Sequence, residues 1–307
     1  MVEKDSRDLM VTIRCLVYNH EPYLRQCLDG FVMQQTNFRF EAIVHDDAST
    51  DGSAAIIREY AAKYPDIIKP IYETENQYSK RDGSIRRIMN EHTHGKYVAM
   101  CEGDDYWTDP LKLQKQVDFL ESHPDFSMCT HRVYVYRQNS QRMEEDNNRQ
   151  YSEDFVYDLD HFVAREGWIT QTLSLLYRRS ALDLTEYYKY KKSKDVTLIY
   201  TLLKSGKGIM LNELMGVYRI HDGGVWQGAK KSIQIKSDLD VMLAIYEHNR
   251  TRQSAILLRR SLYLFGFLGW PFFRKYFKTY LKTIWIIFSE LGIIVTLKAI
   301  VRSLKFF

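Results

Sequence analysis

The chain has few cysteines, and none of them is arranged as a pair. Only four occur in 307 residues, each stands alone, and none belongs to a Cys-x-x-Cys motif. This spacing excludes a disulfide framework and a cysteine-ligated zinc site as the basis of the fold. We therefore expect reduced thiols in the interior of a cytoplasmic protein. The four residues are Cys15, Cys27, Cys101 and Cys129.

Long apolar runs are also missing. No stretch reaches the ~20 uninterrupted apolar residues that a membrane-spanning helix needs. Residues 1–8 are charged and lack the apolar stretch and cleavage site of a secretory signal. No internal repeat or low-complexity tract is present. These absences predict a chain that is neither exported nor inserted across a membrane, and its length suffices for a substantial core.

Positive charge is concentrated near the end of the chain. Residues 248–307 hold eleven Lys or Arg against one acid, Glu290, so this segment carries +10 and the remainder −6 within a total of +4. The segment is also rich in aromatic and aliphatic residues. Both properties predict helices that lie on an anionic membrane surface. The alternative is that these helices pack on the rest of the protein and expose their basic side chains to water.

Two groups of acids each follow a short apolar run. Asp46 and Asp47 follow residues 41–45, and the Glu-Gly-Asp-Asp-Tyr-Trp sequence of residues 102–107, which contains Asp104 and Asp105, follows residues 97–101. In an open α/β sheet the carboxyl ends of strands line the ligand crevice. Acids that converge there repel one another unless a cation or ligand hydroxyls engage them, so the arrangement predicts a divalent metal site. Oxygen ligands favour Mg or Mn over zinc.

Local structure is the alternative role for some of these acids. Ser49, Thr50 and Asp51 precede the helical pattern that starts at Ser53, and residues of these types commonly cap helices. We favour capping for these three. Asp104 and Asp105 stand beside Tyr106 and well before the next expected helix, so capping explains them poorly.

The periodicity of the chain predicts alternating strands and helices in its first half, and therefore a mostly parallel sheet flanked by helices. We expect domain 1 over residues 1–228 and a C-terminal helical region over 229–307. The polar segment 138–152 has the composition of an exposed loop. Strands are predicted near 11–16, 41–46, 67–72, 97–101, 127–136, 173–178 and 209–211, and helices near 21–34, 53–64, 83–93, 111–122, 180–188, 196–205 and 232–259.

Three motifs in order carry a resemblance. These are Val-Thr-Ile-Arg-Cys-Leu-Val-Tyr-Asn-His at residues 11–20, Asp-Asp-Ala-Ser-Thr-Asp-Gly at 46–52 and Glu-Gly-Asp-Asp-Tyr-Trp at 102–107. With these motifs, the first 125 residues resemble a family 2 glycosyltransferase of the bacterial type. The resemblance implies a GT-A fold, which is a Rossmann-like nucleotide-diphospho-sugar transferase fold, and sugar transfer with inversion. It also implies Mg or Mn as cofactor.

The resemblance implies roles for the residues that match these motifs. Tyr18 and Asp47 are expected to bind the nucleotide base, with Asp46 as a substitute for Asp47. Asp105 and Asp104 are expected to hold the metal and the donor's ribose and diphosphate. Glu102 stands where many relatives have Asp, so we leave it as a weaker or indirect ligand.

A second resemblance to the same family lies further along the chain. Lys-Asp-Val-Thr-Leu at residues 194–198 and Tyr-Arg-Ile-His at 218–221 are similar to a pair of motifs in its bacterial branch. There the acid that heads the helix is the general base, which implies Asp195. The Arg-x-His pair lies near the diphosphate, which implies Arg219 and His221, with His221 also a metal ligand. A helix cap for Asp195 and a hydrogen-bonded loop residue for His221 are the structural alternatives.

These expectations describe an enzyme that transfers a hexosyl or N-acetylhexosaminyl group from a nucleoside diphosphate sugar, by default UDP-linked, to a hydroxyl of a glycan or lipid-linked acceptor. The setting would be synthesis of cell-surface polysaccharide or lipopolysaccharide, in the cytoplasm on the inner face of the membrane. Sugar rings stack on tryptophan, although tryptophan is at least as often a core residue. The candidates are Trp107, Trp168 and Trp226.

Two other classes of function compete with this one. A nucleotidyltransferase has a related sheet and metal acids, but it usually carries a glycine-rich basic loop after the first strand, and residues 18–22 are not such a loop. A non-catalytic module could use the basic tail to bind nucleic acid or anionic lipid. The acid groups oppose nucleic acid, which we do not expect as a partner, and the apolar content of the tail favours lipid.

Overall fold

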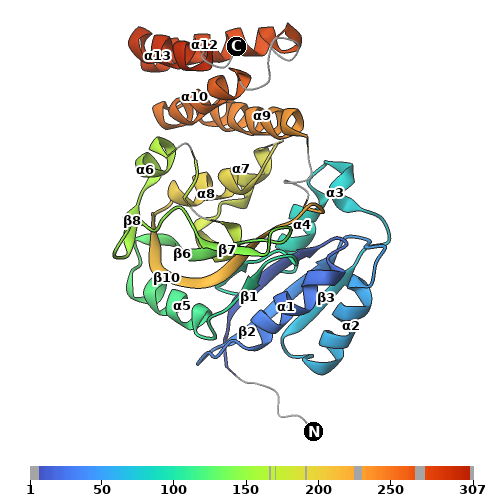
Figure 1. Ribbon diagram of the computed structural model, residues 1–307. Coiled ribbons are helices and arrows are strands. Elements are labelled where there is room, and N and C mark those ends of the chain that lie inside the picture. The colour runs from blue at the N-terminus through green and yellow to red at the C-terminus, as the bar shows by residue number, and fades with distance from the viewer. Residues whose placement is uncertain are drawn as a thin grey trace. The chain divides into compact units, whose positions relative to one another are not determined.

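A computed structural model describes residues 7–165, 167–169, 171–190, 192–224, 230–266 and 274–304 (Figure 1). The chain forms two compact units. The first comprises Met1–Val156, Thr170–Leu182 and Ser205–Ile220, and the second Tyr157–Ile169, Asp183–Lys204 and His221–Phe307. Compact packing does not define where a functional domain ends, so the boundary expected after residue 228 stays a prediction.

The first unit is built on one mixed, mostly parallel sheet with the strand order β3-β2-β1-β4-β9-β6-β10-β5. Strands β3, β2, β1 and β4 run parallel, as do β6 and β10, while β9 is antiparallel to both β4 and β6. This confirms the predicted α/β class. The strands are β1 Leu9–Val17, β2 Arg39–Asp46, β3 Ile68–Tyr72, β4 Tyr97–Met100, β5 Tyr106–Trp107, β6 Phe126–Arg137, β7 Arg142–Glu145, β8 Phe155–Tyr157, β9 Leu176–Arg178 and β10 Lys207–Ile220.

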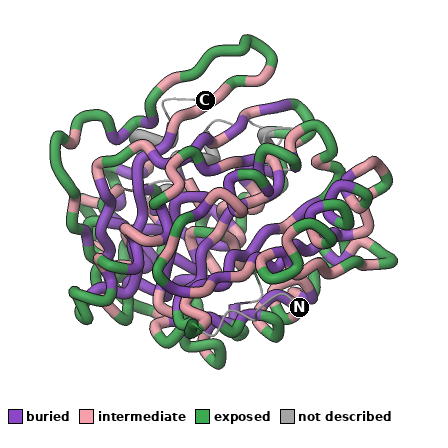
Figure 2. The backbone as a smooth tube through the Cα atoms, turned by 90° about the horizontal axis from the view of Figure 1, so that it is seen from below, coloured by how far each residue is buried: buried purple, intermediate pink, exposed green. Residues whose placement is uncertain are grey.

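Helices of the first unit cover the sheet with their apolar sides. Helices α1 and α2 lie side by side (Figure 1), and Arg25 and Glu59 join them by two hydrogen bonds of 2.8 and 2.6 Å. Apolar side chains of β1, β2 and β4 are buried under these helices in one core, and buried stretches run through the interior in Figure 2. The helices are α1 Glu21–Val32, α2 Ser53–Lys63, α3 Gln77–Lys80, α4 Ser84–Glu91 and α5 Lys112–Ser122, with short 3-10 turns η1 Thr172–Ser174 and η2 Arg179–Ala181.

The second unit is helical. Its C-terminal helices share a small core in which Leu239, Leu262, Tyr280, Ile287 and Ala299 are buried. In the described part of the chain, no helix combines the length and the apolar character needed to cross a membrane. The helices are α6 Leu159–Ala164, α7 Leu184–Lys189, α8 Asp195–Leu203, α9 Lys231–Asn249, α10 Arg252–Gly266, α12 Phe277–Leu291 and α13 Ile293–Leu304.

Two sequence-based expectations about these elements were wrong. The segment 138–152 is not all loop, because β7 within it pairs with β6 in antiparallel register. The single helix expected over 232–259 is broken between α9 and α10. There Thr251 and Ser254 exchange hydrogen bonds between each backbone N–H and the other's hydroxyl, at 3.1 and 3.2 Å. This reciprocal pattern is a capping box, which starts a new helix.

Candidate active site

The second acid group forms a tight turn directly after β4. We call residues Glu102–Asp105 the acid turn. The Asp105 N–H donates to the carbonyl of Glu102 at 3.1 Å, and the Gly103 N–H donates to the carbonyl of Leu16 in β1 at 3.0 Å. A Cβ on Gly103 would stand 2.8 Å from Nδ1 of His20, so only glycine lets the turn approach β1 this closely. The turn is therefore fixed at the carboxyl edge of the parallel strands, as predicted.

Asp105 is a buried carboxylate, only 4% exposed. Its Oδ1 accepts a hydrogen bond of 2.8 Å from the Arg219 N–H in β10. Burial and then the charge of Asp104 raise the pKa of Asp105 well above its usual value, against the lowering effect of that hydrogen bond. Ionisation of the Asp105 carboxyl is therefore unfavourable in the folded protein, and a bound cation would offset that cost.

Asp104 projects toward the loop between β1 and α1. Its Oδ2 lies 3.8 Å from Nε2 of His20. The backbone N–H of His20 in turn donates to the Ser53 hydroxyl at 2.9 Å, which fixes His20 against the start of α2. Sequence reasoning missed His20. Its position immediately before α1, at the end of the first strand motif, was the available signal.

Asp51, which follows the first acid group, connects the loops that precede α1 and α2. Oδ1 of Asp51 accepts from the Ser53 N–H, and Oδ2 accepts from the Glu21 N–H, both at 3.0 Å. Burial would raise the pKa of Asp51, but the hydrogen bonds from Ser53 lower it overall. Oε2 of Glu21 accepts from the Gly52 N–H at 2.7 Å. Asp51 therefore satisfies N–H groups of the first residues of α1 and α2.

The capping expected of Ser49, Thr50 and Asp51 was nevertheless wrong, because Gly52 is the N-cap of α2 and makes no side-chain cap hydrogen bond. Ser49 and Thr50 instead bond to Asn19, which ties this turn to the loop after β1.

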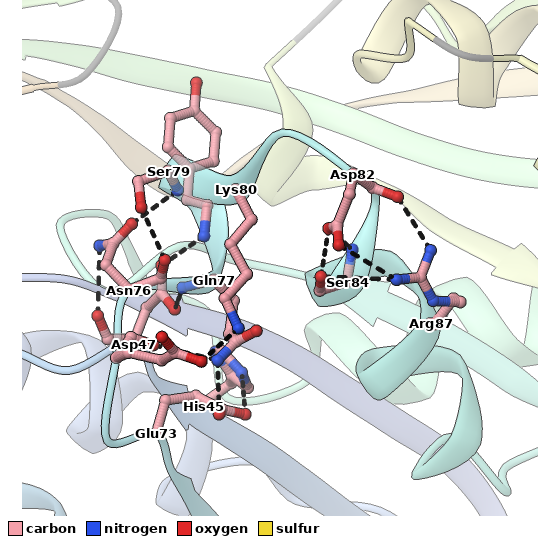
Figure 3. Close-up of polar contacts among 12 residues, drawn as sticks. His45, Asp47, Glu73, Asn76, Gln77, Ser79, Lys80, Asp82, Ser84 and Arg87 are labelled. Carbon is pink, nitrogen blue, oxygen red and sulfur yellow. Dashed lines mark hydrogen bonds and ion pairs between the residues drawn. The ribbon is translucent and has the colours of Figure 1, made fainter.

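Asp47 is buried and its carboxylate supports the next loop (Figure 3). Its two oxygens accept hydrogen bonds of 2.6 and 3.0 Å from the Gln77 and Tyr78 N–H groups at the start of α3. Asp46 is also buried, and its Oδ1 accepts from the Ser49 N–H at 3.3 Å. A carboxylate has about four acceptor positions, so Asp47 can hold α3 and still accept one more donor. Tyr18, which follows β1, is 42% exposed.

Figure 3 shows a second buried polar group beside Asp47. Nε2 of His45 lies 3.2 Å from Oε1 of Glu73, and the other oxygen of Glu73 accepts from the Gln77 side chain at 3.0 Å. His45 itself is fully buried. Glu73 and Asp47 thus approach Gln77 together, which fixes the loop that follows β3.

Asp195, His221 and Trp168 belong to the second unit. Asp195 is exposed and is the first residue of α8, and Lys194 occupies the N-cap position, so the expected acid at a helix start is present. His221 directly follows β10 and is buried, and Trp168 follows α6 and is exposed. The catalytic and binding roles of these three stay predictions. Trp226 lies outside the described residues.

Trp107 corrects one expectation, because it is a core residue. It is 2% exposed, its indole N–H donates to the Leu173 carbonyl at 2.9 Å, and its ring centroid lies 5.0 Å from that of Phe31. Nζ of Lys112 lies 4.0 Å from the indole centroid. Trp107 therefore offers no face to a sugar in this structure. Burial lowers the pKa of Lys112 to about 7, so its amine is partly neutral at physiological pH.

The acid turn fits a divalent cation. It supplies carboxylate oxygens, the ligands that Mg and Mn prefer, and a cation would favour ionisation of Asp105, whose pKa burial raises. Oδ1 is the only oxygen of the Asp105 carboxylate that receives a protein hydrogen bond within the described residues, which leaves Oδ2 for a cation. No group of three or more His, Cys, Asp or Glu is assembled as a metal site among the residues described. Asp104 and Asp105 would thus share the ion with ligand oxygens.

The fold and the acid turn define a nucleotide-sugar-transferase type of protein. The sequence model named "Glycosyl transferase family 2" matches residues 15–185. An uncharacterised protein of Mycobacterium tuberculosis is 34% identical over 80% of this chain and 71% of its own length. The chain belongs to glycosyl transferase family 2, and it is a glycosyltransferase of GT-A fold.

Other relatives and solved structures agree with this assignment. A Bacillus subtilis protein whose name assigns it to teichuronic acid biosynthesis, TuaG, is 26% identical over 73% of this chain and 85% of its own. The fold of residues 1–349 of TarS from S. aureus, solved with UDP-GlcNAc, matches with a TM-score of 0.66, 14% identity and coverage of 96% of this chain and 89% of that fragment. A Pyrobaculum calidifontis mannosyltransferase solved with GDP-Man and Mn²⁺ matches at 0.52, with 16% identity and coverage of 98% and 91%.

Proposed function

We propose that the chain transfers a hexosyl or N-acetylhexosaminyl group from a nucleoside diphosphate sugar to an acceptor hydroxyl, with inversion at the anomeric carbon. The observation that carries the proposal is the acid turn: two adjacent carboxylates, one of them buried, held at the carboxyl edge of the parallel strands of a family 2 glycosyltransferase. Tyr18, with Asp47 or Asp46, would bind the base, because these residues end the two neighbouring strands.

The proposed transfer has two chemical requirements. The charge on the leaving diphosphate must be neutralised, and the acceptor hydroxyl must lose its proton. A Mg or Mn ion bound at Asp104 and Asp105 would supply charge neutralisation of the leaving diphosphate. Asp195 would accept the proton of the acceptor hydroxyl as general base, since it is an exposed acid in the first turn of α8. His221 would approach the diphosphate, and Trp168 or Trp226 would orient the acceptor by stacking.

The names of relatives support the finer assignments. TarS was solved with UDP-GlcNAc, which supports a UDP-linked donor, and the Pyrobaculum enzyme was solved with Mn²⁺, which supports a metal-dependent reaction. The name of TuaG refers to a cell-wall polymer, which supports an acceptor in cell-surface polysaccharide or lipopolysaccharide synthesis, either a glycan or a lipid-linked intermediate.

Release of free nucleoside diphosphate from a panel of sugar nucleotides tests this proposal. We expect release from one sugar nucleotide in the presence of Mg or Mn, with the opposite anomeric configuration in the product by NMR. Release of pyrophosphate from a nucleoside triphosphate and a sugar phosphate would instead favour a nucleotidyltransferase. No turnover of any donor, together with vesicle or nucleic-acid binding, would favour a non-catalytic module. A product with retained anomeric configuration would contradict inversion but not sugar transfer itself.

Helices α12 and α13 support a peripheral site on the inner face of the membrane. Each carries one exposed apolar stripe at helical spacing, with Lys278 and Lys282 exposed in α12 and Lys298 in α13, and the opposite side of α12 is buried. Trp285 is 67% exposed. Exposed apolar side chains flanked by positive charge match an anionic membrane surface. The stripes are Phe277, Leu281, Trp285 and Phe288 in α12, and Ile293, Ile294, Leu297 and Val301 in α13.

Vesicle sedimentation tests the membrane assignment. The full chain should sediment with vesicles that contain anionic lipid and should be released by salt. Trp285→Glu combined with Leu297→Glu should reduce binding at least about tenfold, because each change removes apolar burial and adds repulsion. Met143→Glu, at an apolar residue of β7 that is 48% exposed, is the control and should bind as the unchanged chain does. Equal binding by all three proteins would show that the stripes do not contact lipid.

A further inference from the structure

Arg219 uses every nitrogen of its guanidinium within the protein. Nε donates to the carbonyl of Asp104 at 2.9 Å, Nη1 to Oε1 of Gln138 at 2.7 Å, and Nη2 to Oε1 of Gln26 at 2.7 Å. The residue is 7% exposed. The guanidinium is therefore directed at the back of the acid turn and at two glutamines, and these bonds use three of its five N–H donors.

Three tyrosine rings enclose the same guanidinium. Its central carbon lies 4.8 Å from the ring centroid of Tyr23, 5.4 Å from that of Tyr106 and 5.6 Å from that of Tyr136. Cation–π contacts at these distances stabilise a desolvated cation. Together with the 7% exposure of Arg219, they describe a guanidinium that is largely withdrawn from solvent.

These contacts join four separate segments at the acid turn. Gln26 and Tyr23 belong to α1, Tyr106 begins β5, Gln138 directly follows β6, and Arg219 is in β10. The backbone N–H of Arg219 adds the hydrogen bond to Oδ1 of Asp105. One residue thus fixes both the peptide between Asp104 and Asp105 and the rotamer of the Asp105 carboxylate.

We propose that Gln26, Gln138 and Arg219 form a clamp that positions the Asp104 and Asp105 carboxylates for cation binding, and that Arg219 does not contact the donor diphosphate. This rests on the proposed metal-dependent transfer. It replaces the direct diphosphate contact that the resemblance implied for Arg219. If the Arg219 side chain moved out toward a diphosphate, it would give up three charge-assisted hydrogen bonds and the tyrosine contacts. Gln26 and Gln138 are positioning residues, and neither has a role implied by sequence motifs.

The test measures cation affinity without turnover, using Mn²⁺ alone and Mn²⁺ with UDP, by electron paramagnetic resonance and calorimetry. Gln26→Met removes the acceptor of Nη2 and leaves Arg219 in place. We expect this variant and Arg219→Lys to bind Mn²⁺ at least about tenfold more weakly. Gln26→Glu keeps an acceptor oxygen and should keep Mn²⁺ affinity. In excess chelator, the UDP affinity of all variants should stay within about twofold of the unchanged chain.

Arg178→Lys is the matched control, because the Arg178 guanidinium also donates to backbone carbonyls and to a tyrosine hydroxyl in the same unit. It should lower the melting temperature and leave Mn²⁺ affinity unchanged. Unaltered Mn²⁺ affinity in both Gln26→Met and Arg219→Lys would overturn the clamp. Weaker UDP binding by Arg219→Lys in chelator, with Gln26→Met normal, would make Arg219 a diphosphate ligand instead. An unchanged chain that binds no Mn²⁺ with UDP would remove the proposed metal site, and the clamp with it.

Discussion

Replacement of Asp105 by asparagine should stabilise the ligand-free protein while it lowers activity by roughly a hundredfold or more. The carboxylate is buried and its raised pKa means that ionisation is unfavourable in the folded protein. At neutral pH the ionised group therefore costs stability, and protonation or a neutral replacement removes that cost. The amide oxygen of asparagine can still accept from the Arg219 N–H, as Oδ1 does now at 2.8 Å. The fold around the acid turn should be preserved.

The expected magnitudes are large enough to measure. Replacing one buried charged group that lacks full compensation should raise the free energy of unfolding by about 1–3 kcal/mol. For a unit of this size, 1 kcal/mol corresponds to roughly 2–4 °C in melting temperature. Saturation with a ligand at 100 times its dissociation constant adds ~2.7 kcal/mol to the unchanged chain. Loss of one electrostatic contact at the reacting phosphate costs ~3 kcal/mol, roughly a hundredfold in rate.

Differential scanning fluorimetry with chelator, and then with Mn²⁺ and UDP, measures both effects. Asp105→Asn should melt at a higher temperature than the unchanged chain in chelator and should gain little from Mn²⁺ and UDP. Asp146→Asn is the control, because Asp146 is buried in an ion pair with Arg132 at 3.3 Å. It should lose stability and respond normally to ligand. A lower melting temperature for Asp105→Asn with a normal ligand response would refute this reasoning.

Four further predictions concern other residues. Asp195→Asn should lower turnover by roughly a hundred- to ten-thousandfold with unchanged melting temperature and UDP affinity, whereas normal turnover would move the base to another acid. Asp47→Asn leaves one acceptor oxygen for two N–H donors. It should weaken UDP binding in calorimetry and destabilise the loop by about 1–2 kcal/mol. Unchanged UDP affinity and unchanged stability would dismiss the proposed role of Asp47 in base binding. Gly103→Ala should cost about 1–3 kcal/mol in thermal unfolding, because the added methyl would contact His20, and a neutral effect would mean that the turn can shift. Because the pKa of Lys112 is lowered, the unfolded chain binds more protons than the folded chain from about pH 7 upward. The free energy of unfolding, measured with denaturant, should therefore rise by up to about 1.4 kcal/mol per pH unit between pH 7 and 9. This rise should vanish in Lys112→Met.

The sequence predicted features that depend on local pattern. Apolar runs located β1, β2 and β4, and the acids after β4 fell where a parallel sheet presents its ligand edge. The acid at the start of α8 was also correct in position. These features depend on neighbours within a few residues, which a sequence displays directly.

Features that depend on distant neighbours were missed. Gln26 and Arg219 meet across 193 positions of the chain, and no local spacing indicates such a contact. The sequence left Trp107 open to two roles, sugar stacking and core packing. A sequence does not show whether an indole ring beside the acid turn is covered by other side chains or exposed. β7 is short and polar and is held by pairing with β6, so its composition alone favoured a loop. The break before α10 did have a local signal, since Thr251 and Ser254 stand at capping-box spacing.

Crystals soaked in Mn²⁺ and UDP, with anomalous diffraction recorded at the manganese absorption edge, test the central claim most directly. The account predicts one anomalous peak within coordination distance of the Asp105 carboxylate and of the UDP diphosphate, with Asp104 adjacent and the Arg219 guanidinium still bonded to Gln26 and Gln138. UDP bound in the same crystals with no manganese at the acid turn, or with manganese held elsewhere in the chain, would contradict it.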